Sequence, residues 1–431
     1  MDWKTRSTST RHLYVPPGES LDELAELAGS AGARIVERLV QSRPAPEAAT
    51  LVGKGKVEEL TAAVQAGNVD VVIFDHDLSP TQQRNLEKAL GCKVIDRTQL
   101  ILDIFASRAR TREGRLQVEL AQLNYRLPRL AGHGVEMSRL GGGIGTRGPG
   151  ETQLETDRRR IAKRIKKLED DLEGVRTGRA LHRKRRSAVP LATLALAGYT
   201  NAGKSTLFNR LTEASVVTDA RMFATLDPTV RPVMLPSRRR VLASDTVGFI
   251  GNLPTTLVKA FRATLEEVKE ASLVLHVVDL SSASADAHIA HVAKVLAEIG
   301  AAEIPQILVM NKVDRLPAGE VEAGGEGGAE TMARRLLTGS GVTPDTRAVA
   351  ISALTGAGID RLLRIVDEAL PLDPVVRARF RMPLGDGATL ALLHQYGRVL
   401  ETHYGMEWCE VDAEIPESVK RRLEGSGLRA S

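Results

Sequence analysis

The segment GYTNAGKS, residues 198–205, combines flexible glycines with a lysine and a serine. It follows a short apolar run and precedes a helical pattern, which is the position of a phosphate-binding loop. Glycine lets the backbone wrap closely, so that amide hydrogens point toward phosphate oxygens. Lys204 would reach the β- and γ-phosphates, and the Ser205 hydroxyl would bind Mg²⁺. Alone, the segment predicts a nucleoside triphosphate without identifying its base.

The segment NKVD, residues 311–314, carries groups that can identify the base. The Asp314 carboxylate can accept hydrogen bonds from the N1–H and the exocyclic amine of guanine, and adenine lacks both donors there. Asn311 would contact the purine edge, and the Lys312 stem would cover the base face. A backbone amide of SAL, residues 352–354, can meet the guanine oxygen. In this order after a phosphate loop, the segments predict GTP.

Two further segments are typical of loops that respond to the γ-phosphate. DTVG ends a predicted strand, where Asp245 would hold Mg²⁺ through water and the Gly248 amide would contact the γ-phosphate. In FATLD, which begins at Phe223, Thr225 would bind Mg²⁺ only when GTP is present, and Thr229 is the competing candidate. Loops that are held by the γ-phosphate and released on hydrolysis form a switch.

The predicted site therefore draws on several separate segments, with GTP or GDP and Mg²⁺ as its ligands. The residues assigned to hydrolysis are Lys204, Thr225 and Gly248. The residues assigned to Mg²⁺ are Ser205 and Thr225. The nucleotide-binding set is Gly198, Tyr199, Thr200, Asn201, Ala202, Gly203, Lys204, Ser205, Thr206, Phe223, Ala224, Thr225, Leu226, Asp227, Asp245, Thr246, Val247, Gly248, Asn311, Lys312, Val313, Asp314, Ser352, Ala353 and Leu354.

The residue that follows DTVG is Phe249, where many GTPases carry a glutamine that orients the attacking water. Phenylalanine cannot orient water by hydrogen bonding. We therefore expect slow intrinsic hydrolysis that a partner, a cation or a repositioned backbone makes fast. Asn201 could help to bind K⁺ beside the phosphates, and a loop-stabilising side chain is the equal alternative.

The elements that position these motifs form an α/β protein. Alternating strands and helices over residues 1–105 predict an N-terminal α/β domain, with a strand (ARIVERLV) from Ala33 and a helix capped by Ser79. Residues 191–371 predict the domain that carries the motifs, with a mostly parallel sheet and helices on both faces. Residues 372–431 predict a small C-terminal α/β unit with a helix (ATLALLHQYGRVLETHY) and a strand (WCEVDAEI).

Two long amphipathic segments over residues 106–182 predict a helical hairpin. Their apolar positions recur every three or four residues, and these are Leu116, Leu120, Leu123, Leu127, Leu130, Ile161, Ile165, Leu168, Leu172 and Val175. The two series mirror each other, as an antiparallel pair requires, and the fold point lies in GGGIGTRGPGETQLE, residues 141–155. The alternative is that each helix packs separately on the α/β domain. Residues 183–190 predict a basic linker.

Composition limits the class of protein. A chain of 431 residues with 42% hydrophobic content can build several cores, and 3% aromatic content argues against a nucleic-acid surface built on base stacking. Cys92 and Cys409 fit no metal spacing, and we expect them to be buried, reduced thiols. The N-terminus lacks the apolar core of a signal peptide, and no apolar run approaches the roughly 20 residues of a membrane span. We expect a cytoplasmic monomer.

Together, these segments resemble the HflX family of ribosome-associated GTPases. The resemblance covers about residues 10–370; GGGIGTRGPGETQLE is its specific part, whereas GYTNAGKST, FATLD, DTVGF and NKVD are shared with related GTPases. It implies an N-terminal α/β domain with a helical hairpin, a GTPase domain, and binding to the large ribosomal subunit (50S). It also implies GTP hydrolysis stimulated by the ribosome and, in some members, splitting of stalled or idle ribosomes under stress.

The resemblance further implies that the glycine-rich tip of the hairpin contacts ribosomal RNA near the peptidyl transferase centre. Glycine allows close backbone approach, and Arg139 and Arg147 can contact phosphate. Basic residues beyond the tip supply sequence-independent attraction to RNA, although a solvated helix face is the alternative for each. They are Arg158, Arg159, Arg160, Lys163, Arg164, Lys166, Lys167 and residues 183–186.

Other functions stay open at this point. One is an enzyme that uses the phosphate loop for ATP and the hairpin for a protein partner, although NKVD argues against ATP. Another is an RNA-binding or RNA-remodelling protein in which GTP is regulatory, or a GTPase that silences or assembles ribosomes. The basic turn at residues 53–56 is either structural or another phosphate contact, and the acidic insert at residues 317–343 predicts a surface excursion.

Overall fold

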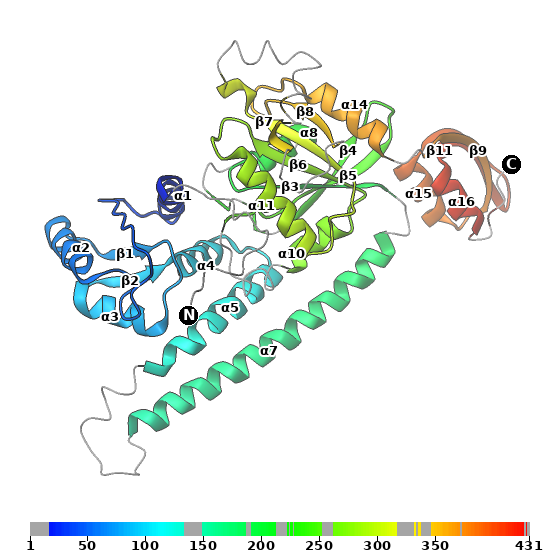
Figure 1. The fold of residues 1–431 in the computed structure, drawn as a ribbon. Helices are drawn as coiled ribbons and strands as arrows, with labels where there is room; N and C mark the ends of the chain where they lie inside the picture. Colours follow the sequence, from blue (N-terminus) through cyan, green and yellow to red (C-terminus); the bar gives the residue numbers. More distant parts are fainter. Residues whose placement is uncertain are drawn as a thin grey trace, which may run out of the picture.

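A computed structural model shows three α/β units and a long pair of helices (Figure 1). No helix in the described ranges is long and apolar enough to cross a membrane. The structure describes residues 17–132, 149–186, 191–212, 222–223, 225–226, 228–251, 262–316, 332, 335–337, 346–370, 373–425 and 428.

The N-terminal unit alternates helices with two parallel strands, as predicted. Ser79 and Gln82 form a capping box at the start of one helix, which confirms the cap expected there. Leucines from this helix pack against the strands in a small core. In chain order the elements are α1 (Pro17–Ser30), α2 (Lys54–Gly67), β1 (Val71–Phe74), α3 (Pro80–Leu90), β2 (Lys93–Asp96) and α4 (Arg97–Arg108).

The segment ARIVERLV, residues 33–40, is not a strand, so this prediction is wrong. Its backbone has no regular secondary structure, and Ile35, Val36 and Val40 are 40%, 52% and 53% exposed. β-Branched residues favour an extended chain, but a strand needs a neighbour to receive its backbone hydrogen bonds. The described sheet of this unit contains β1 and β2 alone.

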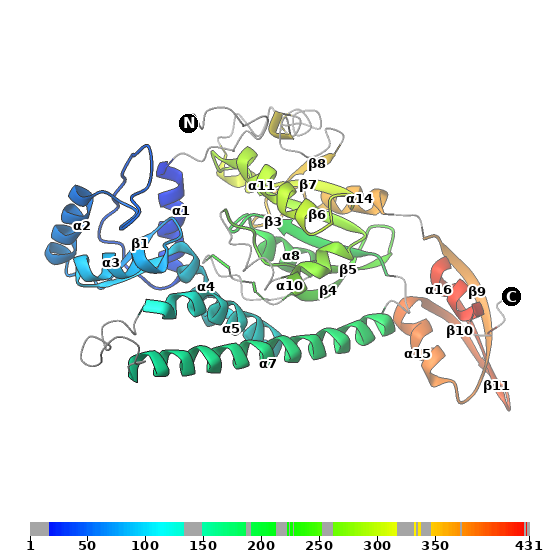
Figure 2. The same ribbon diagram turned by 60° about the horizontal axis from the view of Figure 1, so that its bottom comes forward.

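The helical pair consists of α5 (Arg112–Arg126), which continues as the short 3-10 helix η1 (Leu127–Gly132), and α7 (Pro149–Arg186). α5 and α7 lie side by side and run in opposite directions, as predicted (Figures 1 and 2). The Arg164 guanidinium donates two hydrogen bonds to the Glu119 carboxylate across the pair, at 2.6 and 2.7 Å. We refer to this pair of helices as the arm.

The apolar face of α7 is more buried than that of α5. Leu168 and Leu172 are buried, whereas the predicted leucines of α5 are half-buried. The most buried side of α5 instead includes Val118 and Ala121, which pack with α4. α5 therefore contacts the N-terminal unit on one side and α7 on another. Periodicity found the helix but not this second buried side, because a helix between two neighbours buries two stripes.

α7 continues through Arg186, so residues 183–186 are helical rather than the start of a linker. This part of the prediction is wrong because arginine, lysine, leucine and alanine are strong helix formers even without an apolar stripe. Residues 187–190 lie outside the described residues, as do residues 133–148, which include most of the glycine-rich segment together with Arg139 and Arg147.

The GTPase-like unit has a six-stranded sheet in the order β4-β5-β3-β6-β7-β8, parallel except for β4. The strands are β3 (Thr193–Gly198), β4 (Thr229–Met234), β5 (Arg240–Asp245), β6 (Leu273–Asp279), β7 (Gln306–Asn311) and β8 (Arg347–Ala350). The helices include α8 (Lys204–Thr212), α10 (Arg262–Lys269), α11 (Ala285–Glu298) and α14 (Ile359–Ala369).

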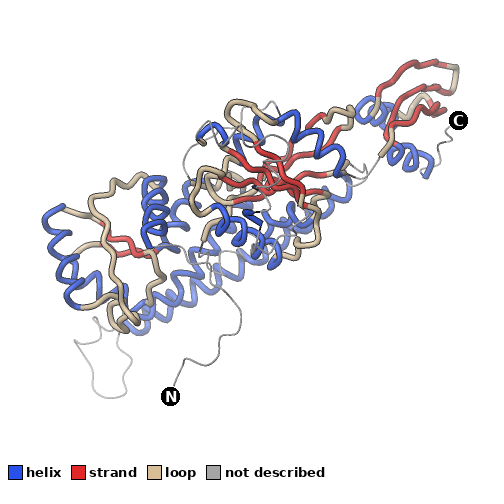
Figure 3. The backbone as a smooth tube through the Cα atoms, turned by 45° about the horizontal axis from the view of Figure 1, so that its top comes forward, coloured by secondary structure: helices blue, strands red, loops and turns tan. Residues whose placement is uncertain are grey.

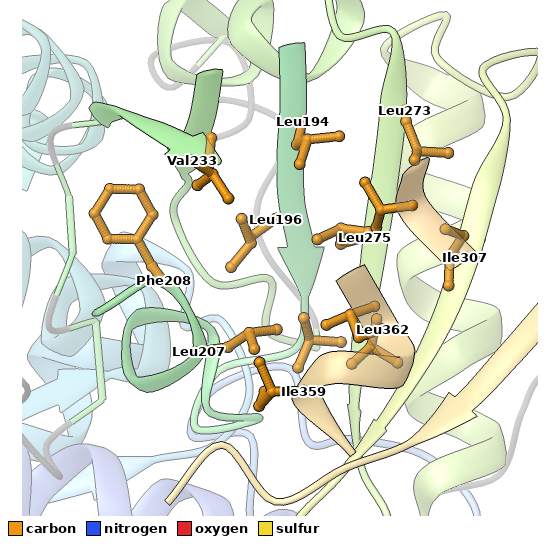
Figure 4. Close-up of a cluster of buried hydrophobic side chains, with 14 of the residues drawn as sticks. Leu194, Leu196, Leu207, Phe208, Val233, Leu273, Leu275, Ile307, Ile359 and Leu362 are labelled. Carbon is orange, nitrogen blue, oxygen red and sulfur yellow. The ribbon is translucent and has the colours of Figure 1, made fainter. Parts of the chain in front are cut away.

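Helices cover both faces of this sheet, which confirms the predicted fold class (Figure 3). On one face, Leu207 of α8 and Leu362 of α14 pack on strand residues such as Leu196 and Leu275 (Figure 4). On the other face, α10 and α11 pack on a second cluster. The carboxyl ends of β3, β5 and β7 meet at one edge, and each carries a predicted motif there.

The C-terminal unit is an antiparallel sheet, β10-β11-β9, with two helices. The elements are β9 (Val375–Pro383), α15 (Gly387–Tyr396), β10 (Arg398–Tyr404), β11 (Trp408–Pro416) and α16 (Glu417–Gly425). The predicted single helix is therefore wrong beyond Tyr396. It ends at Tyr396, and the next residue is Gly397, where an added Cβ would lie 2.3 Å from Ile415 Cγ2 and the chain turns into β10. Cys92 and Cys409 are both free, as expected.

The buried leucine of α7 gives a test of the arm. Leu168 is 0% exposed, so Leu168→Ala should lower the free energy of unfolding by about 2–4 kcal/mol through the cavity it leaves. The neighbouring exposed residue provides the control, and Lys167→Ala should cost less than about 0.5 kcal/mol. Urea unfolding followed by circular dichroism measures both. Equal midpoints for the two variants would contradict the packing of α7 against the rest of the chain.

Candidate nucleotide-binding site

Two glycines shape the phosphate loop between β3 and α8. Gly198 has φ +155°, and an added Cβ would lie 2.2 Å from the Val277 carbonyl oxygen. Gly203 has φ +92°, and its added Cβ would lie 2.2 Å from Asn311 Nδ2. Neither position has room for a side chain, so the loop presents backbone at these points. Asn201, in the exposed part of the loop, has φ +60°.

Lys204 lies under this loop and bonds to its backbone. The ammonium group donates to the carbonyl oxygens of Gly198 at 3.0 Å and Tyr199 at 2.7 Å. Burial lowers the pKa of Lys204 to about 8, with a smaller contribution from the positive charge of Lys312, although Asp245 acts in the opposite direction. The buried ammonium group thus lies at the loop, where Lys204 is predicted to meet phosphate oxygens.

Three side-chain oxygens converge beside the lysine. The hydroxyls of Ser205 and Thr225 lie 2.8 Å apart, and they donate to Asp245 Oδ2 at 2.7 and 2.8 Å. Asp245 is 1% exposed, and burial raises its pKa, against the hydrogen bonds from both hydroxyls. Thr225 therefore lies beside Ser205 and Asp245, whereas Thr229 begins β4, and the binding of Mg²⁺ by Thr225 stays a prediction.

The same oxygens fit a magnesium ion. Asp245 Oδ1 is buried and has no hydrogen-bond partner among the described residues. The described chain contains no cluster of three or more His, Cys, Asp or Glu side chains suited to a metal. Mg²⁺ in nucleotide sites takes few protein oxygens together with phosphates and water, so this sparse donor set suits it. Ser205 and Thr225 would hold the ion directly, and Asp245 would hold it through water.

Asn311 joins the phosphate loop to the SAL segment. Its side chain is 2% exposed and donates to the Ala202 carbonyl oxygen at 2.8 Å, while the Ala353 amide donates to Asn311 Oδ1 at 2.9 Å. We expected this side chain to contact the purine edge. In the structure it holds two parts of the site together, and its contact with the base stays a prediction.

The other NKVD side chains also contact protein groups. Asp314 accepts a hydrogen bond from Ser352 Oγ at 2.5 Å, so the carboxylate that is predicted to read the base lies beside the SAL segment. Lys312 has φ +69° and forms an ion pair with Asp279 at 2.6 Å. The predicted parts of the base site thus meet at the ends of β7 and β8.

The DTVG segment lies directly against the phosphate loop. A Cβ added to Gly248 would lie 2.9 Å from Thr200 Cγ2 and 3.0 Å from Lys204 Nζ, so only glycine fits. The next residue, Phe249, is 2% exposed, and its side chain packs in the core under α10 and α11. Its amide donates to the Gly198 carbonyl oxygen at 3.1 Å. Phe249 thus contributes backbone to the site and no side chain.

Tyr199 connects the phosphate loop to the N-terminal unit. Its hydroxyl donates to Glu23 of α1 at 2.6 Å and accepts from the Gly251 amide at 2.6 Å. Arg97, at the start of α4, bonds to Glu23 and also donates to Asp75 at 2.8 Å and to the Gly251 carbonyl oxygen at 3.3 Å. Burial, followed by the charge of Glu23, raises the pKa of Tyr199, so the hydroxyl keeps its proton.

The sequence did not reveal Glu23 and Arg97 as partners of the site. A single acidic residue on an amphipathic helix and an arginine after a strand carry no local signal of such a contact. Tyr199 was predicted only as part of the loop. Its hydroxyl contact is visible because the fold brings residues 176 positions apart together.

Apolar residues of both switch segments are buried in the N-terminal unit. Phe223 meets Phe105 of α4 edge to face, with 4.6 Å between ring centroids, and the Met222 amide donates to Ser30 Oγ at 2.9 Å. These residues share one core with helices α1, α4 and α5, together with Leu226, Val247, Ile250, Val118 and Ala121. Ala224 and Asp227 lie outside the described residues.

Three family models match consecutive parts of the chain. Their descriptions are "GTP-binding GTPase N-terminal" for residues 18–106, "GTP-binding GTPase Middle Region" for residues 108–186 and "50S ribosome-binding GTPase" for residues 193–312. The GTPase HflX of Caldanaerobacter subterraneus is 47% identical over 94% of this chain and 89% of its own length. This chain belongs to the HflX family of GTPases.

Other HflX proteins agree with this membership. The Escherichia coli GTPase HflX is 43% identical over 95% of this chain and 92% of its own length. That of Alkalihalophilus pseudofirmus is 56% identical over 69% of this chain and 70% of its own length. A GTP-binding protein of Sulfolobus solfataricus, solved with GDP, has a TM-score of 0.44 and 22% identity, covering 81% of this chain and 95% of that one. As an HflX-family member, the protein is a GTPase.

A buried histidine lies in the sheet of the GTPase unit. His276 of β6 is 1% exposed, and its two ring nitrogens have no hydrogen-bond partner in the described part of the chain. Burial, followed by the charge of Lys204, lowers its pKa to about 4. The ring is therefore neutral in the folded protein at neutral pH.

This histidine predicts a loss of stability in mild acid. Below pH 6.5 the unfolded chain binds a proton that folded His276 takes up only near pH 4, so stability falls between these values, by up to about 3 kcal/mol. His276→Leu should remove this part of the decline, and exposed His394→Leu should keep it. Urea unfolding at pH 7.5, 6 and 5 measures it. Parallel pH curves for wild type and His276→Leu would contradict a neutral buried ring.

Proposed function

We propose that this HflX-family GTPase binds the large ribosomal subunit in the cytoplasm and splits or rescues stalled or idle ribosomes under stress. Hydrolysis is slow in the free protein and is stimulated by the ribosome. The observation that carries the proposal is the single buried core that joins both switch segments to α5, the first helix of the arm. The match of residues 193–312 to a family described as "50S ribosome-binding GTPase" supports the partner.

GTP would act by recruiting Thr225 and Gly248, one from each switch segment. Thr225 would leave Asp245 to bind the metal, and the Gly248 amide would turn to the γ-phosphate. Their neighbours Phe223 and Ile250 are packed in the core with α4 and α5. Because a packed core transmits displacement, a change at the γ-phosphate would change the position of the arm.

Hydrolysis needs groups that stabilise charge on the transferred phosphoryl group. Lys204 would bind the β- and γ-phosphates, and the Gly248 amide would donate to a γ-phosphate oxygen. Mg²⁺ bound to Ser205 and Thr225 would neutralise phosphate charge, and K⁺ beside Asn201 is a further part of this proposal. Phe249 offers no side chain to the attacking water, which supports slow hydrolysis in the free protein.

The arm would supply the attraction to RNA. α7 carries 13 Lys and Arg residues against seven Asp and Glu, a net charge of +6 for one helix. The Arg159 and Arg160 side chains are 74% and 78% exposed, so they are open to a partner even while paired with Glu155 and Asp157. Cations placed in this way bind phosphates with little regard to sequence. The rRNA contact at the glycine-rich tip belongs to the same proposal.

Base selectivity can be tested at Asp314. Asp314→Asn replaces one acceptor by a donor that faces the exocyclic amine of guanine, so GTP affinity should fall by about 100-fold or more. Xanthosine triphosphate, with a carbonyl at that position, should lose less affinity or gain some. Competition against a fluorescent guanine nucleotide measures both constants, with Asp360→Asn on α14 as a matched control. Unchanged preference for GTP would remove the base-reading role of Asp314.

Ribosome association can be tested through charge on α7. The exposed pair Lys163→Glu and Lys166→Glu should weaken cosedimentation with large subunits and reduce its salt dependence, because two phosphate contacts are lost. The exposed pair Lys88→Glu and Lys93→Glu makes the same charge change in the N-terminal unit and should have a smaller effect.

The same preparation tests stimulation. GTP turnover by the wild-type protein should rise when large subunits are added, and the α7 pair should reduce that rise while leaving turnover without subunits unchanged. Comparable turnover with and without subunits would refute the proposed activation.

A further inference from the structure

Arg210, in the last turn of α8, is bonded to the SAL segment. Its guanidinium donates to the carbonyl oxygen of Ala353 from Nε at 3.3 Å and to that of Leu354 from Nη2 at 2.5 Å. The guanidinium carbon also lies 3.7 Å from the position of a Cβ on Gly356, in the turn that follows. A rigid, planar fork of donors holds two acceptors in one geometry, which a flexible ammonium group does less well. Arg210 therefore fixes both peptide groups that flank the Leu354 Cα.

The first of these peptide groups carries the Leu354 amide. A trans peptide is planar and its N–H points away from its C=O, and no described peptide bond is cis. Because Arg210 holds the Ala353 carbonyl, the Leu354 amide points away from Arg210.

This amide is also the one in the SAL segment that is left for a ligand. The Ser352 amide donates within its own turn at 2.9 Å, and the Ala353 amide donates to Asn311 Oδ1 at 2.9 Å. The Leu354 amide has no acceptor in the described part of the chain, and the residue is 70% exposed. Of the three amides, that of Leu354 can therefore bind a ligand without giving up a protein partner.

The second peptide group leads to the carboxylate that is predicted to read the base. Its N–H belongs to Thr355 and donates to Ser352 Oγ at 3.1 Å. Ser352 Oγ in turn donates to Asp314 at 2.5 Å. One guanidinium is thus connected through the backbone both to the free amide and to Asp314.

We propose that Arg210 is a positioning residue for guanine recognition, which holds the Ala353 and Leu354 carbonyls so that the Leu354 amide donates to the guanine oxygen. This inference rests on the nucleotide site proposed above. Adenine carries an amine where guanine carries this oxygen, so a fixed amide would place a donor against a donor and disfavour adenine. Arg210 acts through the backbone of the segment, and the amide and Asp314 contact the base.

Replacing the guanine oxygen by sulfur tests this contact by itself. 6-Thio-GDP keeps the N1–H and the exocyclic amine that Asp314 is predicted to bind, but sulfur is a weaker acceptor than oxygen. Wild type should therefore prefer GDP. Arg210→Met should weaken GDP binding about 10-fold and 6-thio-GDP binding less than about threefold, so that the preference shrinks. Competition against a fluorescent guanine nucleotide measures the four constants.

Arg364→Met is the matched control, because this exposed arginine of α14 donates to a carbonyl oxygen of its own helix. It should leave both affinities unchanged. Arg210→Lys keeps the charge without the fork and should also narrow the preference for GDP. Thermal unfolding shows whether Arg210→Met folds; should it not, the lysine variant is judged by the same ratio.

Three results would overturn the proposal. They are equal losses for the two nucleotides, which an arginine that only stabilises the fold would give, an unchanged GDP affinity, and a wild-type protein without preference for GDP. Binding is measured without ribosomal subunits, so failure of the ribosome proposal would leave this result untouched. GDP binding that survives Lys204→Ala would instead remove the nucleotide site itself.

Discussion

The position of the phosphate loop depends on its contact with the N-terminal unit. Tyr199, Glu23 and Arg97 form a chain of hydrogen bonds in which the arginine side chain is only 3% exposed. Burial acts to lower the pKa of Arg97, but the carboxylates of Glu23 and Asp75 outweigh it and raise that pKa. Removing one partner from such a buried pair costs about 3–5 kcal/mol, because the other charge stays behind. The GTPase unit and the N-terminal unit are therefore held at one relative position, because separating these groups costs free energy.

Several polar side chains of the site are hydrogen-bonded to other groups of the protein. Lys204 donates to loop carbonyls, Ser205 and Thr225 donate to Asp245, and Asn311 bonds to Ala202 and Ala353. Most polar side chains that the motifs assign to a ligand thus have protein partners. Nucleotide binding becomes an exchange of hydrogen bonds, whose net energy is smaller than the sum of the new contacts. Such an exchange moves atoms, and Thr225 belongs to a segment that packs in the N-terminal core.

The sequence predicted what is local and missed what depends on neighbours. The phosphate loop, NKVD and the Ser79 cap are short patterns whose residue types carry their own geometry, and each lies where it was expected. The strand predicted at residues 33–40 is wrong because no described strand pairs with this segment. The helix predicted in the C-terminal unit is wrong beyond Tyr396, where Gly397 lies against Ile415. The roles of Glu23 and Arg97, and the bonds of Arg210 to the SAL segment, arise from residues far apart in sequence.

The switch segments and α5 share one buried core, and this core determines how a change at the γ-phosphate would reach the arm. Phe223 and Ile250 each lie two residues from Thr225 and Gly248, which are proposed to meet the γ-phosphate, and they share this core with Val118 of α5. A packed core has no space for a small independent shift, so these residues either stay or take their neighbours with them. If they stay, the switches cannot reach the γ-phosphate without breaking local backbone contacts. If they move, α5 moves, and with it α7, which lies along α5. In the described part of the chain, the arm is thus joined to the switch segments through this packed core.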